Sequence, residues 1–106
     1  MAHTYHQEAP TRADIDTRLG PLVLEFGDDY CGICAAARPA IEQALAERPE
    51  VQHLKIADGR GRPLGRSFGI KLWPTLVFLQ NGREVARLVR PTQAQAISQS
   101  LHLLLK

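Results

Sequence analysis

The fold of this chain is decided by the stretch Leu22-Val23-Leu24-Glu25-Phe26-Gly27-Asp28-Asp29-Tyr30-Cys31-Gly32-Ile33-Cys34. Its apolar start is typical of a buried strand, and the alanine-rich run after residue 34 is typical of a helix. The only two cysteines of the protein lie at this junction, three positions apart. Side chains three apart on a helix lie about 5–6 Å from each other, so slight tightening of the first turn would close a disulfide.

The two cysteines are predicted to play different parts. The first turn of a helix has unpaired N–H groups and the positive end of the helix dipole, and both favour an anion. Cys31, at the helix cap, is therefore predicted to be the thiolate that attacks disulfides. Cys34, one turn further on, is predicted to be shielded and to resolve a mixed disulfide. The pair itself is the predicted redox group, with no other cofactor.

A second motif lies later in the chain, where Trp73-Pro74-Thr75 is followed by the apolar residues 76–79 and by Asn81-Gly82. Together with Cys31-Gly32-Ile33-Cys34 and a proline at position 39, this order resembles the thioredoxin family from about residue 14 onwards. The resemblance implies an α/β thioredoxin fold, a central mixed sheet of four to five strands flanked by helices on both faces. It also implies a cis bond before Pro74 and a loop that lies against the cysteines.

Composition agrees with one soluble domain. The chain has 106 residues, of which 44% are hydrophobic and 23% charged, so residues 1–106 are predicted to form a single domain. Residues 1–10 are either flexible or a short edge strand. No apolar run is long enough to span a membrane, and a net charge of +2 is too small to indicate nucleic-acid binding. The start of the chain lacks the pattern of a signal peptide, which predicts a cytoplasmic protein.

The one charged residue inside the apolar run is Glu25. The resemblance implies a buried carboxyl here, where thioredoxins carry Asp, and burial raises the pKa of a carboxyl. Such a group can exchange a proton with the resolving thiol near neutral pH, so Glu25 is predicted to be catalytic. The alternative is a glutamate at the strand end that turns to solvent. Glu is one methylene longer than Asp, and its reach to Cys34 is left open.

Six residues around the two motifs are predicted to contact the substrate: Tyr30, Gly32, Ile33, Trp73, Pro74 and Thr75. If the proline loop lies against the cysteines, its backbone on either side of Pro74 offers an open edge, to which an extended substrate can add as a strand. Trp73 either adds an apolar contact to the partner or packs into the core.

Three positions depart from the family pattern. Tyr30 stands where the family usually has Trp, Ile33 where it has Pro, and Arg90-Pro91 where a glycine follows the last strand. These departures put docking of the family's usual partners, including a thioredoxin reductase, in question.

Residues 51–57 are predicted to form the next strand. The resemblance places Lys55 near the buried carboxyl, and a one-residue slip would place Leu54 there instead. His53 is predicted to be neither a ligand nor a base. Residues 58–69, rich in Gly and Arg, are predicted to form a loop and a short helix rather than a nucleic-acid-binding segment, with a basic rim that favours acidic partner proteins.

Three hypotheses of function follow. The first is a monomeric thiol–disulfide oxidoreductase that reduces protein disulfides and whose cysteine pair is then reduced again by a thioredoxin reductase or another thiol reductant. The second is a binding or chaperone-like module that docks a partner at the Trp73-Pro74 edge with little reductase activity. The third is a zinc or cluster site in a dimer, which needs four ligands where one C-x-x-C supplies two. We therefore predict no metal.

Overall fold

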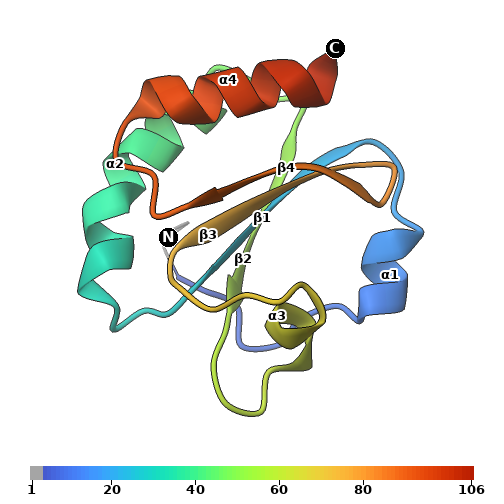
Figure 1. Cartoon of the computed structure of the whole chain (residues 1–106), viewed down its shortest axis with the longest axis vertical. Helices are drawn as coiled ribbons and strands as arrows, with labels where there is room; N and C mark the ends of the chain where they lie inside the picture. The colour runs from blue at the N-terminus through green and yellow to red at the C-terminus, as the bar shows by residue number, and fades with distance from the viewer. Residues whose placement is uncertain (1–3) are drawn as a thin grey trace.

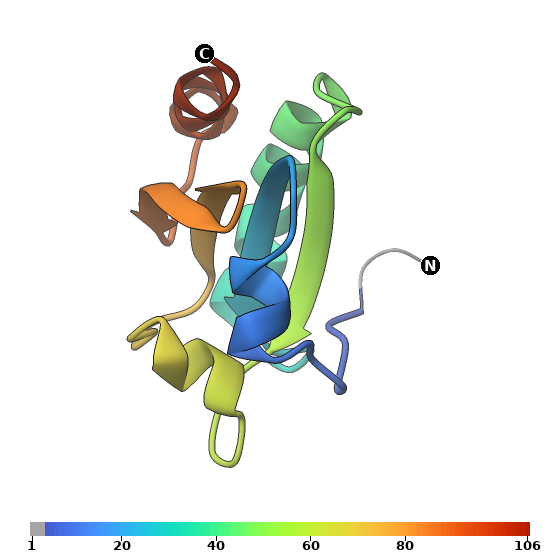
Figure 2. The ribbon, with the colours of Figure 1, turned by 90° about the vertical axis from the view of Figure 1, so that its right-hand side faces the viewer.

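The computed structural model of the chain describes residues 4–106. A four-stranded mixed sheet lies at the centre, and helices cover both of its faces (Figures 1 and 2). The predicted fold class is therefore confirmed. In chain order the elements are α1 (Arg12–Asp16), β1 (Pro21–Gly27), α2 (Gly32–Ala46), β2 (Gln52–Ala57), α3 (Pro63–Ser67), β3 (Thr75–Gln80), β4 (Arg83–Val89) and α4 (Ala94–Leu105).

The strand order in the sheet is β2-β1-β3-β4. The central strand β1 is parallel to β2 and antiparallel to β3, and β4 pairs antiparallel with β3. Because β1 has a strand on each side and helices on each face, nearly all of its residues are buried, which explains its almost unbroken apolar sequence. The end of β1 leads directly into α2, so the two cysteines lie at the edge of the best-packed part of the molecule.

Alternate residues of β1 face the two helical layers. Val23 packs into the core shared with α2 and α4, and Phe26 packs into the core shared with α1 and α3. Side chains two apart on a strand point to the same face. Glu25 therefore points with Val23 towards the layer of α2, the helix that carries Cys34.

Both helices next to β1 in the sequence begin with a cap. The helix α1 begins with a capping box, in which Thr11 and Asp14 bond to each other's backbone, and it ends at Asp16. The helix α2 begins at Gly32 with Cys31 as its N-cap, the position predicted for Cys31.

The segment before α1 forms a single bridge rather than a strand. The N–H of His6 donates to the carbonyl of Lys55 at 2.8 Å, and the N–H of Ala57 donates to the carbonyl of His6 at 3.0 Å. Residues 1–3 of the segment predicted as flexible or edge strand lie outside the described residues. The bridge holds Tyr5 against the end of β2, where its side chain is only 2% exposed.

A hairpin joins β3 and β4. Asn81 and Gly82 have φ values of 52° and 79°, as a tight two-residue turn between antiparallel strands requires. The turn lies against α1: a Cβ added at Gly82 would come within 2.0 Å of the carbonyl oxygen of Asp16. Only glycine fits this position, because both its backbone angle and its surroundings exclude a side chain.

Candidate active site

The cysteine pair lies at the junction of β1 and α2. Cys31 is the N-cap of α2, and its sulfur accepts a hydrogen bond from the backbone N–H of Cys34 at 3.1 Å. Its side chain is partly exposed, whereas Cys34 is 2% exposed, and both thiols are free. The helix end therefore presents one sulfur to a partner, supplies it with an N–H donor that stabilises a thiolate, and shields the other.

Cys34 is held in its neutral form. Burial raises the pKa of its thiol to about 11, and the hydrogen bond with Cys31 acts in the same direction. A thiol with this pKa is almost fully protonated near neutral pH, so Cys34 needs a proton acceptor before it can act as a nucleophile.

Glu25 is buried on the face of β1 that packs against α2, with 2% of its surface exposed, so it does not turn to solvent. Its carboxylate accepts a hydrogen bond from the hydroxyl of Tyr5 and lies 2.8 Å from Nε2 of His53. Lys55 pairs with Glu25 across the sheet, the position that the resemblance implied. A buried carboxylate with two hydrogen-bond partners and a cation beside it is well satisfied as an anion.

The expectation of a raised pKa for Glu25 is wrong. Burial does act to raise it, but the hydrogen bonds from His53 and Tyr5 and the positive charge of Lys55 outweigh burial and bring the pKa below its usual value. The expectation failed because it considered desolvation alone, and the groups that offset desolvation come from parts of the chain distant in sequence.

Two residues of this network were missed by the sequence analysis. His53 was predicted to have no chemical role, yet it is a direct partner of Glu25. Tyr5, from the N-terminal segment, was not singled out. Its hydroxyl donates to Glu25 and lies beside Cys34: a Cβ added at Gly27 would be 2.7 Å from that hydroxyl and 2.8 Å from the sulfur. The one available signal was the position of His53 two residues before Lys55, on the same face of a strand.

The proline loop lies against the cysteines. The Trp73–Pro74 peptide bond is cis, and Trp73 packs with Cys31 against a small buried cluster that contains Tyr5 and Cys34. The ring is half-buried rather than packed fully into the core, and its Nε1 donates to Asp58 at 2.9 Å. Contact of Trp73 with a partner stays a prediction.

The backbone edge beside Pro74 is narrower than expected. Thr75 is 2% exposed and lies inside the sheet, paired with Phe26 of β1 and Val89 of β4, so its backbone is not an open edge. The carbonyl of Trp73 accepts a hydrogen bond from Nε of Arg90 at 2.8 Å. The prediction of an open edge on both sides of Pro74 is therefore wrong at Thr75, and at Trp73 the acceptor is already used within the chain.

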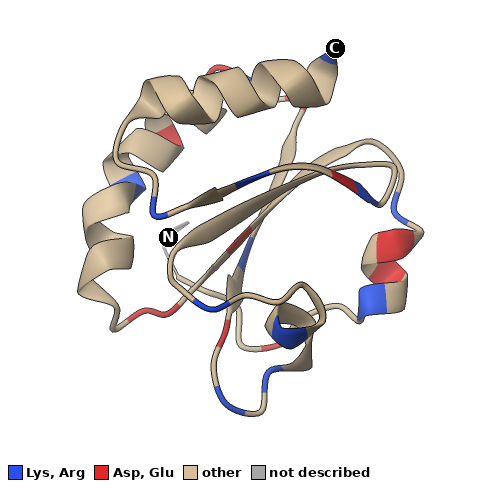
Figure 3. Cartoon of the chain, in the orientation of Figure 1, with Lys and Arg blue, Asp and Glu red and all other residues tan. Residues whose placement is uncertain are grey.

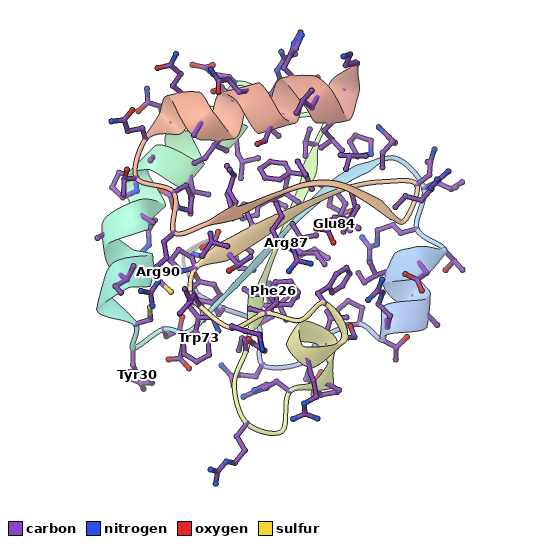
Figure 4. The ribbon with its side chains drawn as sticks, in the orientation of Figure 1. Phe26, Tyr30, Trp73, Glu84, Arg87 and Arg90 are labelled. Atoms are coloured by element: carbon purple, nitrogen blue, oxygen red, sulfur yellow. The ribbon has the colours of Figure 1, made fainter. Side chains whose placement is uncertain are left out.

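The remaining predicted contact residues are the sequence neighbours of Cys31, and Tyr30 projects away from the body of the molecule at the start of α2 (Figure 4). Tyr30 is 98% exposed, and Ile33 is 45% exposed. A Cβ added at Gly32 would meet no atom within 4 Å, so this residue leaves open space next to the exposed thiol. Exposed apolar side chains around a reactive group are typical of a surface that contacts another molecule.

Within residues 4–106, no group of three or more His, Cys, Asp or Glu side chains is arranged to hold a metal ion. In the same part of the chain, no helix has the length and apolar character needed to cross a membrane.

Comparison with known proteins agrees with this geometry. The family model described as Thioredoxin matches residues 4–102. The chain belongs to the thioredoxin family. Membership of this family and the Cys31–Cys34 pair together support a thiol–disulfide oxidoreductase in general.

Individual relatives in the thioredoxin family extend the comparison. The reduced form of thioredoxin 2 from Pseudomonas aeruginosa PAO1 is 51% identical, covers 98% of this chain and 96% of its own, and has a TM-score of 0.88. A thioredoxin from Chlamydia muridarum is 37% identical over 71 residues, which are 66% of this chain and 69% of the relative. Fasciola hepatica thioredoxin, 23% identical, covers 82% of this chain and 83% of its own with a TM-score of 0.69, and it supports the fold alone.

Proposed function

We propose that this chain reduces disulfide bonds in proteins through reversible oxidation of Cys31 and Cys34. The observation that carries the proposal is the contrast between the two thiols at one helix end. Cys31 is partly exposed and accepts an N–H from its own helix, whereas Cys34 is buried against Tyr5, whose hydroxyl donates to the carboxylate of Glu25.

The reaction has two steps. The thiolate of Cys31 attacks one sulfur of the substrate disulfide, forming a mixed disulfide and releasing the other substrate sulfur as a thiolate that takes up a proton. Cys34 then loses its proton and attacks Cys31, which forms the Cys31–Cys34 disulfide and releases the second substrate thiol. The substrate gains two electrons and two protons, and an external thiol reductant must restore the pair.

The surface around Cys31 would hold the substrate. Tyr30 and Ile33 offer apolar contact, Gly32 leaves room for the partner backbone, and the loop of Trp73 and Pro74 lies alongside. Disulfide-containing proteins are the proposed substrates, and a thioredoxin reductase or another thiol reductant is the proposed electron donor, with the chain acting as a monomer. Free thiols serve this role in a reducing compartment, so we propose a cytoplasmic location.

The basic rim would select among partners. Arg60, Arg62 and Arg66 lie on α3 and the loop before it, where Figure 3 shows a group of basic residues. A cavity of about 270 Å³ beside Trp73 is lined in part by Arg62, Arg66 and Lys71. Acidic protein surfaces are therefore the favoured partners.

The test is reduction of insulin disulfides with dithiothreitol as external reductant. Cys31→Ser should abolish activity because the attacking sulfur is lost. Cys34→Ser should form the mixed disulfide and accumulate it, which mass spectrometry of the unreduced protein detects. Full activity in Cys31→Ser would refute the proposal.

A binding module is the second candidate, and the exposed side chains of Tyr30 and Ile33 are the observation that favours it. These two side chains could hold a partner through apolar contact alone, without any thiol chemistry. A module of this kind would bind its partner equally well with both cysteines replaced by serine. Loss of partner capture in that double variant supports catalysis instead.

A further inference from the structure

Four side chains form a continuous path from the buried thiol to the side of the sheet. Cys34 comes from α2, Tyr5 from the N-terminal segment, Glu25 from β1 and His53 from β2. Tyr5 and Cys34 pack in one buried cluster, in which the hydroxyl and the thiol shift each other's pKa. The hydroxyl of Tyr5 donates to Oε2 of Glu25, and Oε1 of Glu25 lies 2.8 Å from Nε2 of His53. His53 has 24% of its side chain exposed, so the path ends where water reaches it.

The path is needed because Cys34 is buried and neutral. A thiol that attacks a mixed disulfide must lose its proton at that moment, and water has little access to a side chain that is 2% exposed. Both carboxylate oxygens of Glu25 already have partners, one on Tyr5 and one on His53. The hydroxyl of Tyr5 is therefore the group through which the carboxylate acts on the sulfur.

Tyr5 suits a relay because it stays neutral. Burial and the negative charge of Glu25 raise the pKa of its hydroxyl above its usual value, so tyrosinate does not accumulate. A neutral hydroxyl can accept a proton from the thiol while it passes its own to the carboxylate.

The charged and titratable surroundings of the path do not interrupt it. Lys55 lies with its ammonium 4.5 Å from the centre of the Tyr5 ring, and across the sheet on the other side Glu25 pairs with the apolar Leu76. Asp29 accepts the backbone N–H of Tyr5 at 2.9 Å and so holds that segment in place. The remaining titratable neighbour is Cys31, which forms the mixed disulfide in the step concerned.

We propose that Tyr5 relays the proton of Cys34 to Glu25 during the second step, and that His53 is a positioning residue that orients the carboxylate and sets its proton affinity. The inference rests on the proposed function. The S–H bond of Cys34 breaks as its sulfur bonds to Cys31, the proton passes to Tyr5, and the hydroxyl proton of Tyr5 passes to Glu25. The bond between Cys31 and the substrate sulfur breaks, and the substrate leaves as a thiolate. Glu25 returns its proton to water at the His53 side.

The test separates the two chemical steps in one mixing experiment. The reduced protein is mixed with dithiobis(nitrobenzoic acid), whose aromatic thiol is coloured. Attack by Cys31 releases one coloured thiol, and attack by Cys34 on the mixed disulfide releases the second. Cys34→Ser should retain the first phase alone, which assigns the phases. Loss of the first phase in the wild-type protein would defeat the proposed function, independently of the relay.

Tyr5→Phe removes only the hydroxyl. We expect the first phase to keep its rate and the second phase to slow by about tenfold or more near neutral pH, since proton transfer by a positioned group contributes at least this much. A purely packing role for Tyr5 would lower stability without changing the ratio of the two phases. A second phase within twofold of the wild-type rate in folded Tyr5→Phe would overturn the proposal.

His53 is tested through the pH profile of the second phase. His53→Leu removes a partner that keeps Glu25 ionised, so the acid limb of the profile should move to higher pH. His53→Gln, whose amide can still donate, should move it less. His102→Gln, on the exposed side of α4, is the matched control and should leave the profile unchanged. If Tyr5→Phe fails to fold, this profile decides: an acid limb that stays in place in His53→Leu overturns the proposal.

Discussion

At the scale of single residues, Arg90 has the largest unexpected effect on the candidate site. Its φ of 53° lies in the left-handed region, which costs an ordinary residue about 1 kcal/mol and glycine nothing. The conformation lets its N–H donate to the carbonyl of Pro74 and its guanidinium donate to the carbonyl of Trp73, both at 2.8 Å. Arg90 therefore occupies a backbone acceptor of Trp73, a residue that packs with Cys31 against the same buried cluster.

Removing the hydrogen bond between the Arg90 side chain and the carbonyl of Trp73 should improve docking of a protein substrate. Arg90→Gly and Arg90→Ala both free the carbonyl of Trp73. We expect each to lower KM for insulin by about fivefold, the equivalent of the ~1 kcal/mol of a hydrogen bond that no longer has to be displaced. Arg90→Gly should fold at least as stably as the wild-type protein, because it relieves the backbone strain.

The small aromatic disulfide provides the internal control for Arg90, since it reacts at Cys31 without adding a strand. Its first phase should be unchanged in both variants. Arg83→Ala, an exposed arginine at the other end of β4, is the matched variant and should leave KM unchanged. Equal KM values for insulin in the wild-type and Arg90 proteins would mean that the Trp73 carbonyl takes no part in docking.

At the scale of elements, the sheet positions the site because the last residues of β1 and the first residues of β3 lie next to it. β1 leads into α2 and its cysteines, while β3 begins directly after Pro74. The two strands pair over Pro21–Gln80 to Phe26–Thr75, so the positions of the proline loop and of the thiols are linked through the same ladder. The other end of β3 is the hairpin that packs on α1.

The contact between the hairpin and α1 can be measured with two glycines. Gly82→Ala should lower the free energy of unfolding by about 1–3 kcal/mol beyond backbone strain, because its Cβ would overlap the carbonyl of Asp16. Gly20→Ala is the control: its φ is 88°, and an added Cβ would meet no atom within 4 Å. Urea denaturation gives the free energy of unfolding of both variants, and the difference between their losses measures the contact between the hairpin and α1. Equal losses in the two variants would contradict the predicted contact.

At the scale of the whole molecule, the buried carboxylate couples stability to pH. The pKa of Glu25 is lower in the folded protein than its ordinary value of 4.5. The stabilisation from its hydrogen bonds is therefore present above pH 4.5 and is lost as pH falls through the folded value, since acid favours the unfolded state, which binds the proton more tightly.

Acidification should therefore cost the wild-type protein more than Glu25→Gln, which has no proton to gain. Urea denaturation of both proteins at pH 7 and at about pH 3 gives the two losses. The other titrating groups are shared by the two proteins, so the difference between the losses reports Glu25. If Glu25→Gln loses as much stability between pH 7 and about pH 3 as the wild-type protein, a group other than Glu25 controls the loss of stability in acid.

Much of the fold and of the thiol chemistry could be predicted from neighbouring residues. The limits of β1 are set by its apolar run, the hairpin by Asn81-Gly82, and the unequal cysteines by their spacing at a helix start. Each of these depends on interactions between residues close in the sequence, which local geometry and the helix dipole govern.

What surrounds the thiols depends on how the chain folds back on itself. The pKa of Glu25, the contacts of Tyr5 and His53, and the hydrogen bond from Arg90 to Trp73 depend on residues 17 to 30 positions apart. No local pattern specifies such pairs, because they form where the chain returns to the same place and a buried polar group must find a partner. Local sequence therefore specifies the fold and the reactive pair, whereas the packing of distant segments sets the hydrogen-bond partners of Glu25 and joins the carbonyl of Trp73 to Arg90.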